Sequence, residues 1–290
     1  MGEIVMIPFR RILFPIDFSE AALAMVPYVH EMAQRFHSTV TVLNVFDLVH
    51  DYRVASCSDY EYADIPYTAT MQKLRDQRYQ RLEEFSRSYF SDVGHSARME
   101  DGDPAMVIEG VAQREGTDLI VMPTKGLGRF RRLLLGSITA KVLHDVTYPV
   151  LTGAHVTESG FVSPGGYRSI LCGVELNAEA GVILKAAGDL AQAYSARLFL
   201  LHIEPSHEHR EPASPESIDQ AFREASGSEI TVDVTARVLA GGIAEGIRRT
   251  ALEESADLVV VGRGHQTGIS RMWSHLYKIV SESPCPVLSV

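Results

Sequence analysis

The sequence predicts an α/β protein built from two tandem, doubly wound domains, each with a five-stranded parallel sheet covered by helices on both faces. The chain has 290 residues, enough for two domains of about 145 residues each. The segment that begins at Arg10 lines up with the segment that begins at Arg168, so the chain contains an internal repeat. Within each copy, short apolar runs alternate with helical patterns, which is typical of parallel sheets.

The repeat sets the expected domain boundaries. The offset between matched residues is 158 at the first match, 139 at Asp118 and Asp257, and 137 at Pro149 and Pro286. The first copy therefore has a longer connection between its second and third strands, and the second copy is two residues shorter near its end. We expect a first domain over 1–153, a linker containing Gly, Ser and Thr over 154–167, and a second domain over 168–290.

The first copy reads as strand and helix in alternation. The expected strands are the apolar runs at 11–16, 40–45, 95–100, 118–123 and 149–153. Between the first two strands, one helical face carries Ala22, Met25, Val26, Val29, Ala33 and Phe36. Pro27 should kink that helix. Asp103 and Pro104 signal the start of a later helix and Gly116 its end, and the last helix should open near Ser137.

Two clusters fall where the carboxyl ends of these strands should meet. Asp17 ends the first strand, and a segment with glycines at 126, 128 and 136 joins the fourth strand to the helix near Ser137. Ligands of doubly wound sheets collect at this edge, and a helix start favours an anion because its first N–H groups are unpaired. Asp17 could accept hydrogen bonds from a ribose or an adenine amino group, so the pattern indicates a nucleotide site.

At this point the chain resembles the universal stress protein family in its tandem two-copy form. ATP-binding members carry Gly-x2-Gly-x9-Gly-Ser/Thr after the fourth strand, and here Gly126, Gly136 and Ser137 keep the last part of that pattern, while Pro123 replaces the leading glycine. The resemblance implies an adenine nucleotide alpha hydrolase-like fold with strand order 3-2-1-4-5, and ATP, with Mg²⁺, as the ligand.

The resemblance also implies which residues line the site. They are Pro15, Ile16, Asp17 and Val45 on the adenosine side, and Met122, Gly126, Gly136, Ser137, Ile138 and Thr139 on the phosphate side, with Pro123 at the rim. Proline lacks an N–H and fixes φ near about −65°, so any donor or left-handed turn that glycine supplied at 123 is lost.

The second copy departs further from the pattern. Glu175 takes the place of Asp17, Gly173 that of Pro15, His265 falls near Gly126, Trp273 replaces Gly136 and Ser274 keeps the place of Ser137. An indole should block the approach of phosphate to the backbone, so we expect the second site to be nucleotide-poor.

Other readings of these residues remain open. The glycines could be ordinary turn residues, and Asp17, Ser19 and Ser137 could serve only as helix caps. The arginines at 129, 131 and 132 fit a solvated charge run better than a phosphate contact. The trio His202, His207 and His209 has a loose metal-like spacing, but its members fall in a strand and a loop, and we expect no metal site there.

The long connection over 47–70 combines acidic and tyrosine residues. It could form a lid or a docking face, or it could simply pack over the edge of the sheet.

Composition limits the partners. Lys and Arg number 27 against 37 Asp and Glu, for a net charge of −10, which disfavours nucleic acid and anionic lipid as partners. The three cysteines share no metal-like spacing and suit a reducing compartment. No run of apolar residues is long enough to span a membrane and no signal-peptide pattern is present, so we expect a cytoplasmic location.

These observations predict a stress-response regulatory protein whose first copy binds ATP and whose nucleotide biases conformation or the binding of an unknown protein partner. No nucleophile and base can be assigned, so enzymatic activity should not exceed slow ATP hydrolysis or autophosphorylation. The alternative is a scaffold that binds no nucleotide, or a metabolite receptor of the same fold. Both copies end in short apolar strands, which predicts that the copies pack with approximate twofold symmetry through these edges, with homodimerisation of the whole chain as a further possibility.

Overall fold

The computed structural model describes residues 9–47, 67–124, 135–153, 166–204, 213–226, 231–263 and 269–290. In the first repeat the elements are β1 (Arg11–Pro15), α1 (Glu20–Leu23), α2 (Val26–Phe36), β2 (Thr39–Phe46), α4 (Tyr67–Phe90), β3 (Gly94–Asp101), α5 (Pro104–Glu115), β4 (Leu119–Pro123), α6 (Ser137–Asp145) and β5 (Val150–Gly153). In the second they are β6 (Ser169–Gly173), α8 (Ala180–Tyr194), β7 (Arg197–Glu204), α9 (Pro215–Ser226), β8 (Val234–Ala240), α10 (Ile243–Glu253), β9 (Leu258–Val261), α11 (Ile269–Glu282) and β10 (Val287–Ser289).

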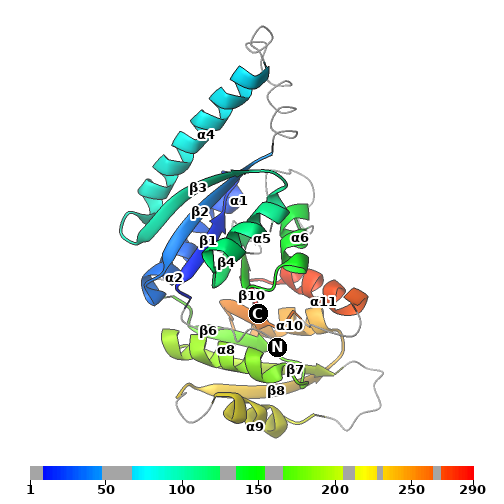
Figure 1. The fold of residues 1–290 in the computed structure, drawn as a ribbon. Helices are drawn as coiled ribbons and strands as arrows, with labels where there is room; N and C mark the ends of the chain where they lie inside the picture. Colours follow the sequence, from blue (N-terminus) through cyan, green and yellow to red (C-terminus); the bar gives the residue numbers. More distant parts are fainter. Residues whose placement is uncertain are drawn as a thin grey trace.

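All ten of these strands join one sheet, in the order β3-β2-β1-β4-β5-β10-β9-β6-β7-β8 (Figure 1). Within each repeat the strands are parallel and follow the order 3-2-1-4-5, as expected. The repeats meet where β5 pairs antiparallel with β10, with Leu151 opposite Leu288 and Thr152 opposite Val287. Because Leu151 and Leu288 are equivalent positions of the two repeats, this register places a local twofold axis between them, which confirms the predicted edge-to-edge packing. Association of two whole chains stays a prediction.

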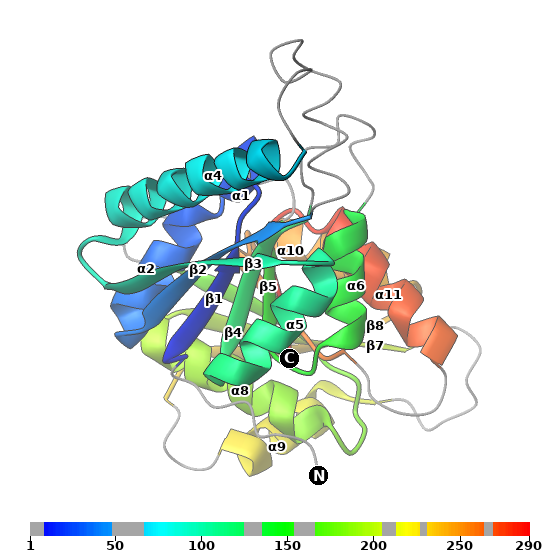
Figure 2. The same ribbon diagram turned by 45° about the horizontal axis from the view of Figure 1, so that its top comes forward.

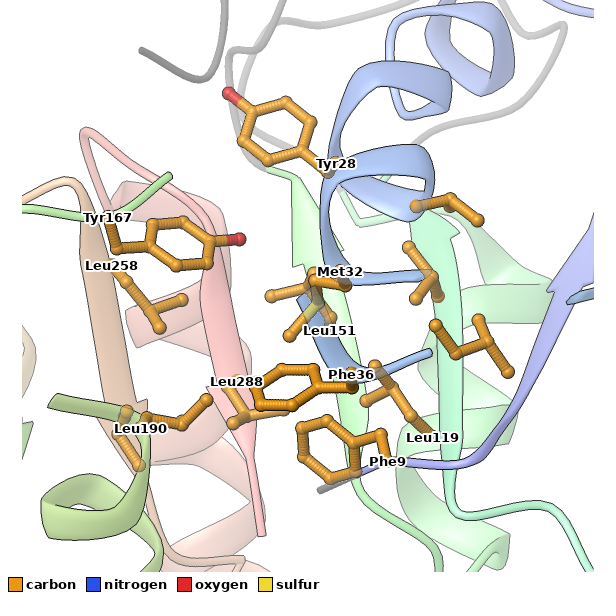
Figure 3. Close-up of a cluster of buried hydrophobic side chains, with 14 of the residues drawn as sticks. Phe9, Tyr28, Met32, Phe36, Leu119, Leu151, Tyr167, Leu190, Leu258 and Leu288 are labelled. Carbon is orange, nitrogen blue, oxygen red and sulfur yellow. The ribbon is translucent and has the colours of Figure 1, made fainter. Parts of the chain in front are cut away.

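Helices cover both faces of the sheet because consecutive strand residues point to opposite sides. On β1, Ile12 and Phe14 belong to the core shared with α2, α4, α8 and α9, whereas Leu13 belongs to the core shared with α5, α6, α10 and α11. Both cores run through both repeats. Figure 3 shows part of the first, where Phe36 of α2, Leu190 of α8, Leu151 and Leu288 lie together.

Local signals explain where the helices begin and end. Pro27 does more than kink its segment: α1 ends before it, and α2 begins at Val26 with the proline in its first turn. The helix α5 starts and stops where the sequence predicts, with Asp103 as N-cap and Gly116, at φ 59°, as C-cap. The helix α6 opens at Ser137, also as predicted, but its N-cap is Gly136.

The long connection of the first repeat lies mostly outside the described residues, at 48–66. Its last residues form the start of α4, which has 24 residues against 12 in its counterpart α9 and projects from the body of the molecule in Figure 1. The interval 154–165, which covers most of the predicted linker, also lies outside the described ranges.

Candidate nucleotide site

The carboxyl end of β1 is fixed by its neighbour β2. The Ile16 N–H donates to the Leu43 carbonyl at 2.8 Å, and Asn44 Nδ2 donates to the Ile16 carbonyl at 2.6 Å. Pro15 and Ile16 are buried, while Asp17 is exposed at the edge of the sheet. Val45, on β2, is half-buried against the core that contains α5 and α6.

Asp17 does not cap the first helix. Ser19 takes that role, because its Oγ accepts from the Ala22 N–H at 3.1 Å. Asp17 Oδ1 instead accepts from the Ser19 N–H at 3.0 Å, and the carboxylate stays exposed. Between them Phe18 adopts a left-handed φ of 59°, an uncommon conformation for a bulky residue, and this sharp turn leaves Asp17 at the strand end.

On the opposite side, two hydrogen bonds hold the amino end of α6 against the carboxyl end of β4. The Gly136 N–H donates to the Thr124 carbonyl at 2.7 Å, and Thr139 Oγ1 donates to the Pro123 carbonyl at 2.9 Å. Thr124 Oγ1 donates to the Gly153 carbonyl at 2.9 Å, which ties this corner to β5. Pro123 and Met122 are buried in β4, so the proline acts here as an acceptor that anchors α6 and uses no N–H in doing so.

Among the described residues, no side chain caps the amino end of α6. Gly136 has extended backbone angles, φ −62° and ψ 144°, and as N-cap it supplies no side-chain hydrogen bond. Ser137 and Ile138 are exposed in the first turn, and Thr139 is buried. A helix start without a capping side chain presents unpaired N–H groups and the positive end of the helix dipole, which together favour an anion.

The structure therefore brings the predicted residues to one edge of the sheet, because β1 lies between β2 and β4. Asp17 and Val45 lie on the β1–β2 side of this edge, and Ser137 and Ile138 on the β4–α6 side. Gly126 and the arginines at 129, 131 and 132 lie outside the described residues.

The arginines of α4 also reach this edge, and sequence reasoning missed them. Arg78 lies with its guanidinium 5.0 Å from the ring centroid of Phe46, and Arg81 lies 4.2 Å from that of Phe18. Arg75 forms an ion pair of 3.1 Å with Asp101, at the end of β3. The three-residue spacing of these arginines on one helical face was the available signal, but only the fold shows that this face covers the strand ends.

The second repeat is built differently at the matching place. Gly262, the counterpart of Pro123, is covered by Ile183 of α8, whose Cδ1 lies 2.3 Å from where a Cβ would stand. The helix α11 already begins at Ile269, so Ser274 lies inside it, whereas Ser137 opens α6. His202 takes the role of Asn44, since its Nδ1 bonds the Val174 carbonyl at 2.9 Å.

This arrangement adds two differences to the expectation that the second repeat is nucleotide-poor, which stays a prediction. The sequence assigned the loss to the bulk of Trp273, whereas the structure adds a displaced helix start and a filled strand end. No three His, Cys, Asp or Glu side chains gather as metal ligands would in the part of the chain that the structure describes, and His207 and His209 fall outside it.

The fold defines a tandem doubly wound α/β protein, and the carboxyl ends of β1 and β4 form its candidate ligand site. The model of the universal stress protein family matches residues 8–152 and again 166–290, and the chain belongs to that family. This membership supports a role in the stress response. None of the helices in the described ranges combines the length and hydrophobicity that crossing a bilayer requires.

The curated relatives match about half of this chain over nearly their whole length. A universal stress protein of Thermus aquaticus is 29% identical over 143 residues, 49% of this chain and 97% of its own length. One of Methanocaldococcus jannaschii is 26% identical over 156 residues, 49% of this chain and 93% of its own length. The crystal structure of a universal stress protein from Archaeoglobus fulgidus matches 96% of this chain and 97% of its own, with a TM-score of 0.73 at 20% identity, which shows the shared tandem fold.

Proposed function

We propose that the first repeat binds ATP as a regulatory ligand across the carboxyl ends of β1 and β4. The observation that carries the proposal is the open amino end of α6, where Gly136 leaves the first turn without a capping side chain. The triphosphate would lie against the N–H groups of this turn, with the Ser137 hydroxyl as a further donor. Thr139 is already engaged with Pro123 and would hold the helix rather than the ligand.

The adenosine would lie on the β1–β2 side of the same edge. The exposed Asp17 carboxylate is an acceptor for ribose hydroxyls or the adenine amino group, and the half-buried Val45 offers an apolar contact for the base. Mg²⁺ would arrive as the counter-ion of the phosphates, because the described residues offer no cluster of their own for a metal. The proposal includes no catalytic residue.

Nucleotide would act by shifting the protein between conformations or between free and partner-bound forms. A ligand can do so only if its affinities for the two states differ. Leu135 and Gly136, which lead into α6, and the α4 helix border the site, so they are the described parts that nucleotide would reach first. The partner that responds remains a protein of unknown identity.

The test is titration calorimetry of ATP with Mg²⁺ on the purified chain and on Gly136→Trp. The indole would fill the space in front of the open helix start, so we expect affinity to fall by about tenfold or more. Gly242→Trp is the matched control. Gly242 is also an uncapped N-cap with extended angles, φ −77° and ψ 127°, but at the start of α10 in the second repeat.

Equal ATP affinity in wild type and Gly136→Trp would show that the site is assigned wrongly. Mass spectrometry of small molecules released by denaturing a fresh preparation separates the alternatives: adenine nucleotide supports the proposal, another metabolite indicates a receptor of different specificity, and no ligand together with no ATP binding indicates a scaffold.

A further inference from the structure

The second repeat holds α6 of the first repeat at both ends. In Figures 1 and 2, α6 and α11 lie side by side, one from each repeat, next to the β5–β10 junction. Their buried residues belong to one core that includes Leu135 and Val142 from the first repeat and Leu276 and Ile279 from the second. The helix whose open end forms the candidate phosphate site is therefore packed against the other repeat.

At the amino end of α6, the contact comes from Tyr277 of α11. The Leu135 N–H donates to Tyr277 Oη at 3.3 Å, and the Leu135 side chain is buried. Leu135 directly precedes the N-cap Gly136, whose own N–H is bound to the Thr124 carbonyl. The two successive amides that lead into α6 are thus held by groups from different repeats.

At the carboxyl end of α6, the contact comes from Arg263, which follows β9. Its guanidinium donates to the carbonyls of Val146, the C-cap of α6, and Tyr148, and its Nε donates to Ser289 Oγ at 3.2 Å. Arg263 is buried, and among the described residues its guanidinium donates to backbone carbonyls and to one hydroxyl. A cation at a helix C-terminus also interacts favourably with the helix dipole.

The first repeat has no equivalent of either contact. In the first repeat, Ala140 stands at the position of Tyr277 and Thr124 at the position of Arg263. Neither side chain is long enough to form the corresponding hydrogen bond with the other repeat. The first repeat thus does not hold α11 in the same way. The helix that the other repeat holds is α6, whose N-cap is Gly136. The degenerate repeat contributes to the site of the other.

We propose that the second repeat positions the nucleotide site of the first, with Tyr277 as the positioning residue that orients the entry into α6 and Arg263 as the anchor of its far end. The proposal rests on the proposed function of the first repeat. Its consequence is that ATP affinity depends on side chains of a repeat that itself binds no ATP.

The test is Tyr277→Phe, which removes one hydroxyl and keeps the ring. We expect ATP affinity to fall about threefold to tenfold, the range for one lost hydrogen bond, together with a small decrease in melting temperature because the Leu135 N–H loses its partner. Tyr89→Phe, which removes an exposed hydroxyl on α4, is the control and should leave affinity unchanged. Hydrogen exchange without nucleotide should show faster exchange of the Leu135 amide in Tyr277→Phe only.

A second variant, Arg263→Lys, keeps the charge but loses the fork that reaches two carbonyls, and it should also weaken ATP binding. If wild type binds ATP and Tyr277→Phe binds it equally well, the positioning role is overturned while the proposed function stands. If Tyr277→Phe lowers the melting temperature and leaves affinity unchanged, the contact is structural only and the proposal also fails. If wild type binds no ATP, both proposals fall.

Discussion

Glu31 of α2 forms a side-chain hydrogen bond with Tyr194 of α8 and so links the two repeats. Its Oε2 accepts from Tyr194 Oη of α8 at 2.6 Å, and Arg35 lies 3.8 Å from its Oε1. Burial raises the pKa of the Glu31 carboxyl, more strongly than the hydrogen bond from Tyr194 and the charge of Arg35 lower it. The folded protein therefore holds a proton on this carboxyl to a higher pH than the unfolded chain does.

This shift fixes the sign of a pH dependence. A carboxyl whose pKa is raised by folding contributes stability at low pH that is lost as the pH rises through the folded pKa. Glu31→Gln keeps the acceptor but cannot ionise, so its stability relative to wild type should increase between about pH 4 and pH 7. Melting temperatures of both proteins across this range test the prediction, and a constant or decreasing difference would contradict it.

At the scale of the elements, α5 and α6 are joined by the cap of one of them. Asp103 Oδ1 accepts from the N–H groups of Ala105 at 3.1 Å and Met106 at 3.2 Å, and its carboxylate lies 3.4 Å from Lys141 Nζ of α6. The hydrogen bond from the Met106 N–H, followed by the contact with Lys141 and the hydrogen bond from the Ala105 N–H, lowers the pKa of Asp103, although burial opposes this shift. The cap thus orders the helix that packs beside the candidate site.

Replacing this cap should have a moderate effect on stability. Asp103→Ala leaves the first turn of α5 without its acceptor and should cost about 1 kcal/mol. Asp103→Asn, which keeps a capping oxygen, should lose less. Urea unfolding monitored by circular dichroism provides the measurement, and equal midpoints for Asp103→Ala and wild type would show that the cap contributes nothing.

At the scale of the whole molecule, the two repeats share their cores and their sheet. Leu151 and Leu288 face each other at the twofold axis, and both are fully buried in a core that extends from α2 to α8 (Figure 3). Two domains connected only by a linker would unfold separately, whereas a continuous sheet and core should unfold together.

A destabilising substitution in the first repeat should therefore also lower the stability of the second. Leu151→Ala removes buried methyl groups and should destabilise the chain by about 2–5 kcal/mol. The single tryptophan, Trp273, belongs to α11 of the second repeat, so its fluorescence reports on the unfolding of that helix. We expect the urea midpoint measured by Trp273 fluorescence to fall together with that measured by circular dichroism. A fluorescence midpoint that does not move would show that the repeats unfold independently.

The sequence by itself determined the elements and their order. Apolar runs placed the strands, Asp103 and Gly116 set the ends of α5, and the repeat predicted that β5 and β10 would pair, because these features depend on local chemistry or on internal similarity. It also placed Asp17 at the end of β1 and the start of α6 at Ser137, since the end of a strand and the start of a helix can be read from neighbouring residues.

Only the tertiary structure decided how the repeats act on each other. Tyr277 and Arg263 look like ordinary helix and loop residues in the sequence, and their contacts with Leu135 and Val146 join positions more than a hundred residues apart. The contact of Ile183 with Gly262 and the position of the α4 arginines over the strand ends also appear only in the folded structure. Such contacts depend on how helices pack across a completed sheet, which no local pattern encodes.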